Sequence, residues 1–236
     1  MEKKLESNFD DRSKLLLKND FTKLSKFKVA ICGVGGVGSI IPLALLRSGI
    51  FNFLLIDFDT VDVSNLNRQF AYEAEDIGKK KVLALSAHMR KLRKEAAIDT
   101  VFAKIDKDFN FSLLDKCDYV FDCIDDIDAK VLLIKYCQEK NIKIISSLGM
   151  GNRLDSTKVV ITRLNKTTGD PLAKKLRYLL KINNVDTSKI IVSFSSEEPI
   201  IKSKVIGSMV FVPNSSGLAM ASYAIKELLS IGLTEE

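Results

Sequence analysis

The sequence predicts an α/β fold in which helices cover both faces of a doubly wound, mainly parallel sheet. Short apolar segments that resemble strands alternate with segments of helical periodicity up to residue 147. The first of these strands runs directly into a glycine-rich turn at 33–38, and a helical segment follows it. Strand, glycine turn and helix in this order are typical of the first βα unit of a Rossmann-like domain.

The individual elements follow from this alternation. Because each helical segment separates two strand segments, the strands are expected to run parallel. The predicted strands are 28–31, 51–56, 119–124 and 143–147, and the predicted helices are 39–47, 80–93 and 129–139.

The alternation stops after residue 151. Residues 159–164 and 207–212 have the composition of strands but no helix alternates with them, so we expect added mixed strands. A C-terminal helix is predicted at 215–229. Residues 1–27 are expected to form an N-terminal helical arm, and 165–206 a polar insertion with one helix. We therefore predict one domain over 1–236.

Composition limits the classes of function. Hydrophobic residues make up 46% and charged residues 28% of the chain, as in globular proteins. No apolar run approaches the roughly 20 residues of a membrane helix, and the N-terminus lacks a signal-peptide pattern. We therefore expect no membrane insertion and a cytoplasmic location. The net charge of +6 is compatible with a polyanionic partner.

Cysteine and histidine usage argues against a structural zinc site and against catalysis by paired imidazoles. Because no two of the four cysteines form a Cys-x-x-Cys pair, no structural zinc is expected. His88 is the only histidine, which excludes catalysis by two imidazoles. The cysteines all lie in apolar segments and are expected to be reduced core thiols; they are Cys32, Cys117, Cys123 and Cys137.

The glycine turn predicts a phosphate site. Its glycines allow a tight turn and let backbone N–H groups approach a phosphate at a helix N-terminus; they are Gly33, Gly35, Gly36 and Gly38. Asp57 ends the next strand, where an acid can bind ribose hydroxyls. These residues alone fit a dinucleotide such as NAD and ATP equally well.

Three charged residues favour ATP. Arg68 and Lys81 can neutralise charge that develops on phosphates, and Asp125 follows a parallel strand, where it can hold Mg²⁺. Singly, Lys81 could be a solvated helix charge and Asp125 a helix N-cap. A plain NAD-binding module would leave all three without roles. The set therefore predicts an enzyme that cleaves ATP.

The chain resembles the ThiF family of ATP-dependent carboxyl-adenylating enzymes, which includes the ubiquitin-activating type. The matching segments are GVGGVG at 33–38, LIDFDTVDVSNLNRQ at 55–69, IGKKKV at 77–82 and DCIDD at 122–126. The resemblance implies ATP and Mg²⁺ as cofactors. It assigns Asp57 to the ribose, Arg68 and Lys81 to the phosphates, and Asp125 to the metal. It also places Asp59 and Asn67 in the phosphate–metal region, with Gln69 beside the nucleotide.

The resemblance also implies a homodimer in which an N-terminal arginine reaches the partner's ATP. Arg12 is the candidate for this role, and Lys14 is an alternative. We therefore include Arg12 with Arg68, Lys81 and Asp125 among the expected catalytic residues.

Further segments resemble one branch of the family. They are SSLGMGNRLD at 146–155, KTTGDPLAK at 166–174, SSEEP at 195–199 and GSMVFVP at 207–213. Members of this branch use ATP to close the side chain of threonylcarbamoyladenosine in tRNA into a ring. The resemblance thus implies tRNA carrying threonylcarbamoyladenosine as the partner, and it leaves a sulfur-transfer or accessory protein open as another.

The acyl acceptor is the remaining question. An activator that forms a thioester needs a mobile thiol, but 165–206 contains no cysteine, and Cys123 lies within a predicted strand. We therefore expect the nucleophile to come from the substrate, as ring closure requires. The alternative is an adenylyltransferase that activates the C-terminal glycine of a ubiquitin-like sulfur carrier.

The helix at 172–181 carries a potential tRNA surface. Its apolar residues fall on one helical face, and the other face contains Lys174, Lys175, Arg177 and Lys181. A basic face can contact phosphates without reading sequence. The plainer interpretation, a solvated helix face, remains open from the sequence.

Overall fold

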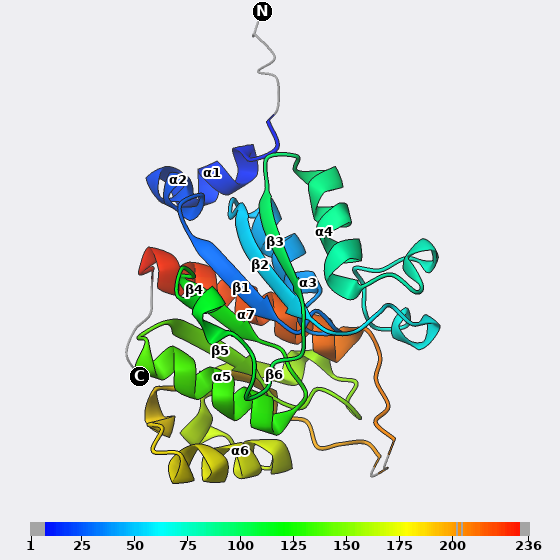
Figure 1. Cartoon of the computed structure of the whole chain (residues 1–236), viewed down its shortest axis with the longest axis vertical. Helices are drawn as coiled ribbons and strands as arrows, with labels where there is room; N and C mark the ends of the chain where they lie inside the picture. Colours follow the sequence, from blue (N-terminus) through cyan, green and yellow to red (C-terminus); the bar gives the residue numbers. More distant parts are fainter. Residues whose placement is uncertain (1–7, 202, 204, 232–236) are drawn as a thin grey trace, which may run out of the picture.

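The computed structural model describes residues 8–201, 203 and 205–231. One seven-stranded sheet runs through this part of the chain in the order β3-β2-β1-β4-β5-β7-β6, and only β6 is antiparallel to its neighbour (Figure 1). The predicted fold class is confirmed. The strands are β1 (Lys28–Cys32), β2 (Asn52–Asp57), β3 (Ala97–Phe102), β4 (Tyr119–Asp122), β5 (Lys143–Ser147), β6 (Val159–Arg163) and β7 (Ile191–Ser195).

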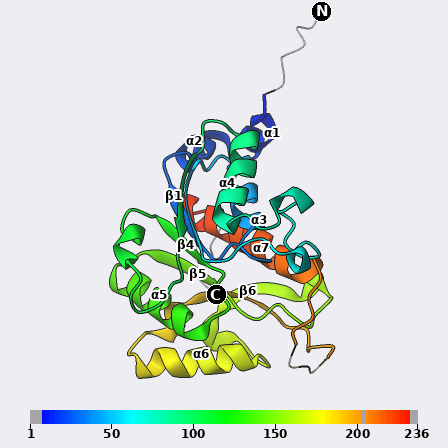
Figure 2. The ribbon, with the colours of Figure 1, turned by 45° about the vertical axis from the view of Figure 1, so that its right-hand side comes forward.

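Helices cover both faces of this sheet (Figures 1 and 2). One face packs against α2, α3, α4 and α7, and the other against α5, with α6 beside α5. The helices are α1 (Asp11–Leu17), α2 (Phe21–Leu24), α3 (Ile40–Arg47), α4 (Lys81–Leu92), α5 (Ile127–Glu139), α6 (Pro171–Ile182) and α7 (Phe211–Leu229).

Successive side chains of β1 point to opposite faces of the sheet, so this strand contributes to the hydrophobic cores on both faces. Val29 and Ile31 belong to the core under α3, α4 and α7, whereas Ala30 and Cys32 belong to the core under α5. All four side chains are fully buried, so β1 reads as a continuous apolar run.

The strand order reverses between β1 and β4. From β1 the chain continues through β2 to β3 on one side, and β4 then pairs with the other side of β1. In open parallel sheets such a switch point leaves a crevice at the carboxyl ends of the two strands, where ligands bind. The glycine turn follows β1, and the loop with Asp125 follows β4, so both lie at this crevice.

The prediction of a strand at 207–212 is wrong. Residues 207–210 form a loop, and α7 begins at Phe211. The Gly207 N–H donates to Asn152 Oδ1 at 2.6 Å, and the Ser208 carbonyl accepts from Asn67 at 2.9 Å, so neither group joins a sheet ladder. Pro213 lies in the first turn of α7, where its missing N–H costs no helical hydrogen bond.

The segment 165–206 contributes more than the helix expected of it. Besides α6 it supplies β7, which lies between β5 and β6 in the main sheet. Ser193 of β7 is buried, and its hydroxyl lies 2.8 Å from that of Ser216 in α7. β7 was not predicted because its serines interrupt the apolar pattern. The edge strand β3 was not predicted for the same reason, because it too contains polar residues.

The N-terminal arm is helical where the structure describes it, over α1 and α2. Residues 1–7 of the arm lie outside the described residues. Phe21 and Leu24 of α2 pack into the core under α3 and α7. Of the helices described, none combines the length and apolarity needed to cross a membrane.

Candidate active site

A pocket of about 810 Å³ opens at the switch point. The glycine turn and the ends of β1, β2 and β4 form one side of it, which we call the nucleotide side; the loop after β5, the start of α6 and residues 206–213 form the other, the acceptor side. Most of the predicted site residues line the pocket, namely Gly33, Gly35, Gly36, Asp57, Asp59, Arg68, Gln69, Lys81 and Asp125.

The glycine turn is shaped by close backbone contacts. Gly33 has a φ of +85°, and a Cβ there would meet the Cys123 carbonyl oxygen at 2.7 Å. A Cβ on Gly38 would lie 1.9 Å from the Gly33 carbonyl oxygen. Gly38 is buried and does not line the pocket. A glycine is therefore required at position 38 for the turn to close on itself, and its predicted contact with a phosphate stays a prediction.

Asp57 fixes the turn from β2. Its Oδ2 accepts from the Val34 N–H at 2.7 Å, and its Oδ1 accepts from the Asp59 N–H at 2.8 Å. Burial raises the pKa of this carboxyl, although the two backbone N–H groups partly counter the effect. Asp57 thus anchors the turn and also lines the pocket, and its predicted contact with a ribose stays a prediction.

Lys81 brings a buried cation to the pocket. It is the first residue of α4 and only 5% exposed. Its Nζ lies 2.8 Å from Asp59 Oδ2, and its N–H donates to the Asp59 carbonyl at 3.0 Å. An ammonium group has three protons, so Lys81 can donate to Asp59 and to a phosphate together. The interpretation of Lys81 as a solvated helix charge is therefore wrong.

Arg68 reaches the pocket from the loop after β2. Its guanidinium donates to the Ser64 carbonyl at 2.6 Å and to Asn67 Oδ1 at 2.9 Å. Asn67 itself is exposed and does not line the pocket, and its predicted place in the phosphate–metal region stays a prediction. Because Asn67 also donates to the Ser208 carbonyl, it orients Arg68 and ties two loops together. Asn65, which the sequence reasoning missed, is buried and does line the pocket.

Gln69 lines the pocket and carries a buried acceptor without a partner. The side chain is 4% exposed, and within the described residues its Oε1 has no hydrogen-bond partner. A buried amide oxygen without a partner is costly, so a bound donor would stabilise it. This supports the predicted contact of Gln69 with a ligand.

Asp125 and Asp126 are neighbours in the chain but differ in their contacts. Asp126 is the N-cap of α5, and its Oδ1 accepts from the Asp128 and Ala129 N–H groups. Asp125 is exposed, lines the pocket and makes no hydrogen bond or ion pair within the described residues. The N-cap interpretation of Asp125 is thus wrong. Its carboxylate fits Mg²⁺, which is commonly held by one or two carboxylates together with substrate phosphates.

A buried ion pair supports the loop that carries Asp125. Asp122 Oδ2 lies 3.0 Å from Lys130 Nζ and accepts from Ser146 Oγ at 2.5 Å. Asp122 Oδ1 accepts from the Ile124 N–H at 3.2 Å. Asp122 and Lys130 are both fully buried. Sequence reasoning did not find this pair, because Lys130 lies on a helix at a position that the apolar pattern does not mark.

The cysteines lack the properties of nucleophiles. Burial raises the pKa of Cys123, which lines the pocket, far above its ordinary value. Burial raises the pKa of Cys117 to about 11, and it also raises the pKa values of Cys32 and Cys137. All four are free thiols. Since the thiolate is the reactive form, Cys123 is a packed residue here.

The acceptor side was not predicted as part of the site. It is lined by backbone and apolar side chains, among them Ser147, Leu148, Gly149, Met150, Gly151, Leu172 and Ile206. Lys104, at the end of β3, lines the pocket as well and lies 3.8 Å from Asp126. A correct assignment of β3 would have placed Lys104 at the carboxyl edge of the sheet.

Three other candidate residues lie away from the pocket. Arg12 is exposed on α1 and does not line it. His88 lies 2.6 Å from Asp76, an acid that caps a short helical turn. Arg177 does not belong to the exposed basic face, because its guanidinium donates to the carbonyls of Leu164 and Thr167. Lys174, Lys175 and Lys181 are exposed as predicted.

Comparison with known proteins extends this picture. The sequence model of the ThiF family matches residues 11–235. A tRNA threonylcarbamoyladenosine dehydratase of Bacillus subtilis is 33% identical over 235 residues, which is 90% of this chain and 91% of the relative. The crystal structure of an Escherichia coli tRNA N6-threonylcarbamoyladenosine dehydratase in complex with ATP matches with a TM-score of 0.88 at 29% identity, covering 94% of this chain and 93% of that one. The same enzyme in complex with AMP matches with a TM-score of 0.87 at 28% identity, covering 95% and 98%.

Proposed function

Because the chain belongs to the ThiF family, we propose that it is an ATP-dependent enzyme that dehydrates N6-threonylcarbamoyladenosine in tRNA to a cyclic form. One observation carries this proposal. Arg68, Lys81 and Asp125 surround the glycine turn at the switch point of a chain that is similar to such dehydratases over nearly its whole length.

The first step is adenylation of the substrate carboxylate. The threonyl carboxylate attacks the α-phosphorus of ATP, a new C–O–P linkage forms, and the bond to pyrophosphate breaks. Lys81 and Arg68 line the pocket and stabilise the negative charge that develops on the phosphate oxygens. Asp57 and the glycine turn hold the nucleotide, since Asp57 fixes the Val34 N–H that shapes the turn.

Asp125 would hold Mg²⁺ in this site. The ion would neutralise phosphate charge and orient the leaving pyrophosphate. The support is the chemistry of the donor, an exposed carboxylate that faces the pocket and is not used as a helix cap.

The second step closes the ring. An atom of the substrate's carbamoyl group attacks the acyl carbon, the acyl–oxygen bond breaks, and AMP leaves. Nucleophile and acyl group belong to one side chain, so the attack is intramolecular and has a high effective concentration. The raised pKa of Cys123 supports this route over transfer to a thiol of this protein.

The exposed face of α6 is the tRNA contact that we propose. Lys174, Lys175 and Lys181 point to solvent, whereas Leu176 and Leu180 are buried against the core of α5 and β7. Leu172, in the first turn of the same helix, lines the pocket. A tRNA backbone lying along this face would therefore pass close to the pocket entrance.

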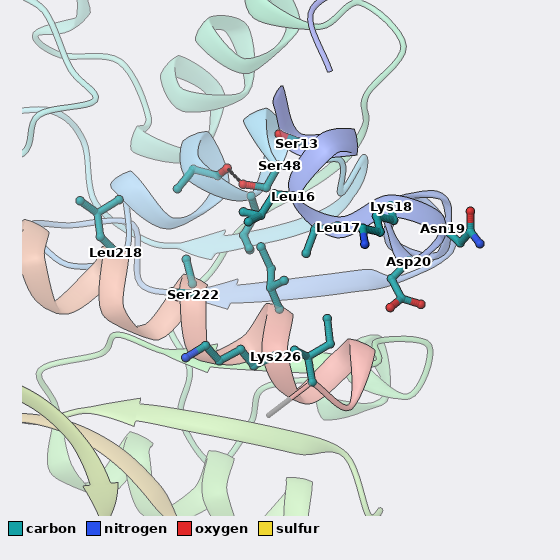
Figure 3. Close-up of a pocket in the computed structure, with 15 residues that line it drawn as sticks. Ser13, Leu16, Leu17, Lys18, Asn19, Asp20, Ser48, Leu218, Ser222 and Lys226 are labelled. Atoms are coloured by element: carbon teal, nitrogen blue, oxygen red, sulfur yellow. Dashed lines mark hydrogen bonds between the residues drawn. The ribbon is translucent and has the colours of Figure 1, made fainter. Parts of the chain in front are cut away.

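A homodimer completes the proposal. An apolar groove of about 950 Å³ lies between α1, α3 and α7, with Leu16 and Leu17 on one side and Leu218 and Ser222 on the other (Figure 3). Leu16 is 81% exposed and Leu218 49%. A second copy would cover these side chains and stabilise the dimer by removing apolar surface from water. We place the assembly in the cytoplasm, whose reducing conditions suit four free cysteines.

Arg12 supplies the test of that dimer. It is exposed on α1, the helix that borders the groove, from where it would reach the partner's pocket. We expect Arg12→Ala and Asp125→Ala proteins to be inactive alone and to regain activity when mixed and reassembled, because one site of a mixed dimer has both residues intact. If mixing restores nothing while Lys14→Ala does complement Asp125→Ala, Lys14 is the residue that reaches across.

Pyrophosphate release tests the adenylation step and its acceptor together. We expect release from ATP with tRNA that carries threonylcarbamoyladenosine and none with the same tRNA carrying plain adenosine. Release that instead requires a ubiquitin-like sulfur carrier ending in Gly-Gly would favour the alternative function. Absence of release with either substrate would contradict both.

A further inference from the structure

Three segments of the chain meet behind the acceptor side. They are the loop after β5 at 147–155, residues 166–172 at the start of α6, and the turn after β7 at 195–199. The mechanism above uses none of their polar residues. All three converge on one side chain, that of Arg153, which is only 8% exposed.

Arg153 binds each segment. Its Nη1 donates to the Gly149 carbonyl at 2.5 Å, and its Nε donates to the Glu197 carbonyl at 2.9 Å. Its Nη2 lies 3.7 Å from Oδ2 of Asp170, the buried N-cap of α6. The rigid planar fork of an arginine makes such contacts together, which a lysine cannot do.

Glu197 closes the arrangement from the other side. Its carboxylate accepts from the Leu154 N–H at 3.0 Å and from the Asp155 N–H at 2.8 Å. The backbone on both sides of Arg153 is thereby held, through carbonyls before it and N–H groups after it. We call Arg153, Asp170 and Glu197 the clamp.

The clamp determines the direction of the peptide groups in the pocket lining. Gly149, Met150 and Gly151 all line the acceptor side. Because a trans peptide points its N–H opposite to its C=O, the Met150 N–H is directed away from Arg153 when the Gly149 carbonyl faces it. Within the described residues, the N–H groups of Gly149, Met150 and Gly151 have no hydrogen-bond partner.

We propose that the backbone at Gly149–Gly151, with the Met150 N–H as its donor, is the subsite for the threonyl carboxylate of the modified nucleoside, and that Arg153 is the residue that positions it. The inference rests on the proposed function and names the part of the pocket that recognises the substrate's side chain. A backbone N–H without a partner can donate to a carboxylate oxygen, so such a subsite needs no charged side chain. The adenylation site lies across the same pocket, so a carboxylate held here faces the nucleotide side.

The geometry separates this role from ATP binding. Arg68 and Asp125 come from other loops and Lys81 from the start of α4, and within the described residues no hydrogen bond or ion pair joins them to the clamp. Loss of the clamp should therefore change recognition of the modified side chain and leave both ATP binding and contacts with the tRNA body intact.

The test compares the binding of three probes to the wild-type protein and to Arg153→Lys. No hydrolysable ATP is present, so the tRNA is not converted during the measurement. The probes are an ATP analogue, tRNA carrying threonylcarbamoyladenosine, and the same tRNA carrying plain adenosine. Lysine keeps the charge opposite Asp170 but loses the fork. We expect the preference for modified over plain tRNA to fall about tenfold, as for the loss of a hydrogen bond to a charged group. The ATP analogue and plain tRNA should bind as in wild type.

Two further variants separate the effect of the clamp from a general effect of substituting an arginine. Arg163→Lys, at an exposed arginine that ends β6, is the matched control and should behave as wild type. Glu197→Gln weakens the clamp without touching Arg153 and should shift the same preference in the same direction. If Arg153→Lys does not fold, Glu197→Gln decides the matter alone.

The results that overturn the inference differ from those that overturn the function. A wild-type protein that does not prefer modified tRNA would contradict the proposed function. A wild-type preference that survives both clamp variants unchanged would contradict only the inference. Equal losses for all three probes would mean that the clamp supports the whole pocket rather than the carboxylate subsite.

Discussion

The two sides of the pocket are built from different groups. On the nucleotide side, charged side chains line the pocket: Arg68 and Asp125 come from loops, and Lys81 from the start of α4. On the acceptor side, backbone and apolar groups line the pocket, and the charged residues Arg153 and Asp170 are buried behind them. The difference indicates that charged side chains belong where charge develops during reaction, and backbone groups where a substrate must be oriented.

The largest effect is expected at Asp125. Asp125→Ala should lower the turnover number by about 1,000-fold, because loss of a metal ligand removes several kcal/mol of charge stabilisation. The fold should remain intact, since the side chain is exposed and does not cap a helix. Turnover at saturating ATP and Mg²⁺ and a thermal melt would measure both. Asp128→Ala, an exposed acid nearby on α5, is the control, and full activity of Asp125→Ala would remove the metal assignment.

The second largest effect is expected at Lys81. Lys81→Met keeps the buried stem and removes the cation, so we expect a loss of about 100-fold in turnover, as for one lost donor to developing charge. The Asp59 carboxylate left behind is half exposed and can be solvated. Lys80→Met, at the neighbouring exposed lysine, serves as the control. A loss confined to the KM for ATP would show that Lys81 stabilises bound ATP and the transition state equally, which would contradict a role in the chemical step.

The lysines of α6 test the acceptor side with a smaller effect. Changing Lys174 and Lys175 to Gln should weaken tRNA binding and lower the slope of log affinity against log salt by about two, one for each phosphate contact. The affinity is measured by titration at several salt concentrations. The same change at Lys91 and Lys94, two exposed lysines at the end of α4, should have no such effect. Equal slopes for both pairs would mean that the α6 face is merely solvated.

The smallest effect concerns an anchor of the nucleotide side. Burial of Asp76 acts to raise its pKa, but hydrogen bonds from His88, the Glu73 N–H and Lys79 outweigh it and lower the pKa to about 2. A folded-state pKa below the ordinary value of about 3.9 means stabilisation that is complete above pH ~4 and lost as the pH falls toward 2. Asp76→Asn should therefore unfold more easily than wild type at neutral pH, by about 2 kcal/mol. The difference should shrink between pH ~4 and 2 in denaturant titrations; a constant difference would contradict the ionic origin.

The sequence predicted the nucleotide side better than the acceptor side for a physical reason. Asp57 ends β2, Asp125 follows β4 and Lys81 begins α4, and the alternation of apolar strands and helices reveals where those element ends are. Arg153 acts through contacts with Gly149, Glu197 and Asp170, which are distant in the chain and meet only in the folded sheet. β7 was missed because its buried Ser193 is hydrogen-bonded to Ser216 of α7, a tertiary contact that local propensity does not contain.

Contacts within the fold also decide what individual residues do. Asn67 and Gly38 belong to recognisable motifs, and in the structure Asn67 accepts from Arg68, while Gly38 lets the turn close. Arg177 has the helical spacing of a solvent-facing residue, but it donates to the carbonyls of Leu164 and Thr167, at a short helical turn after β6. Such contacts depend on segments that the local pattern does not bring together.

The central claim is that ATP-driven ring closure on tRNA takes place in this pocket. Mass spectrometry of nucleosides from tRNA carrying threonylcarbamoyladenosine, incubated with the purified protein and ATP, tests it most directly. We expect the modified nucleoside to lose the mass of one water, only when ATP is present and not with Asp125→Ala. An unchanged nucleoside mass with folded wild-type protein, ATP and Mg²⁺ would contradict the account.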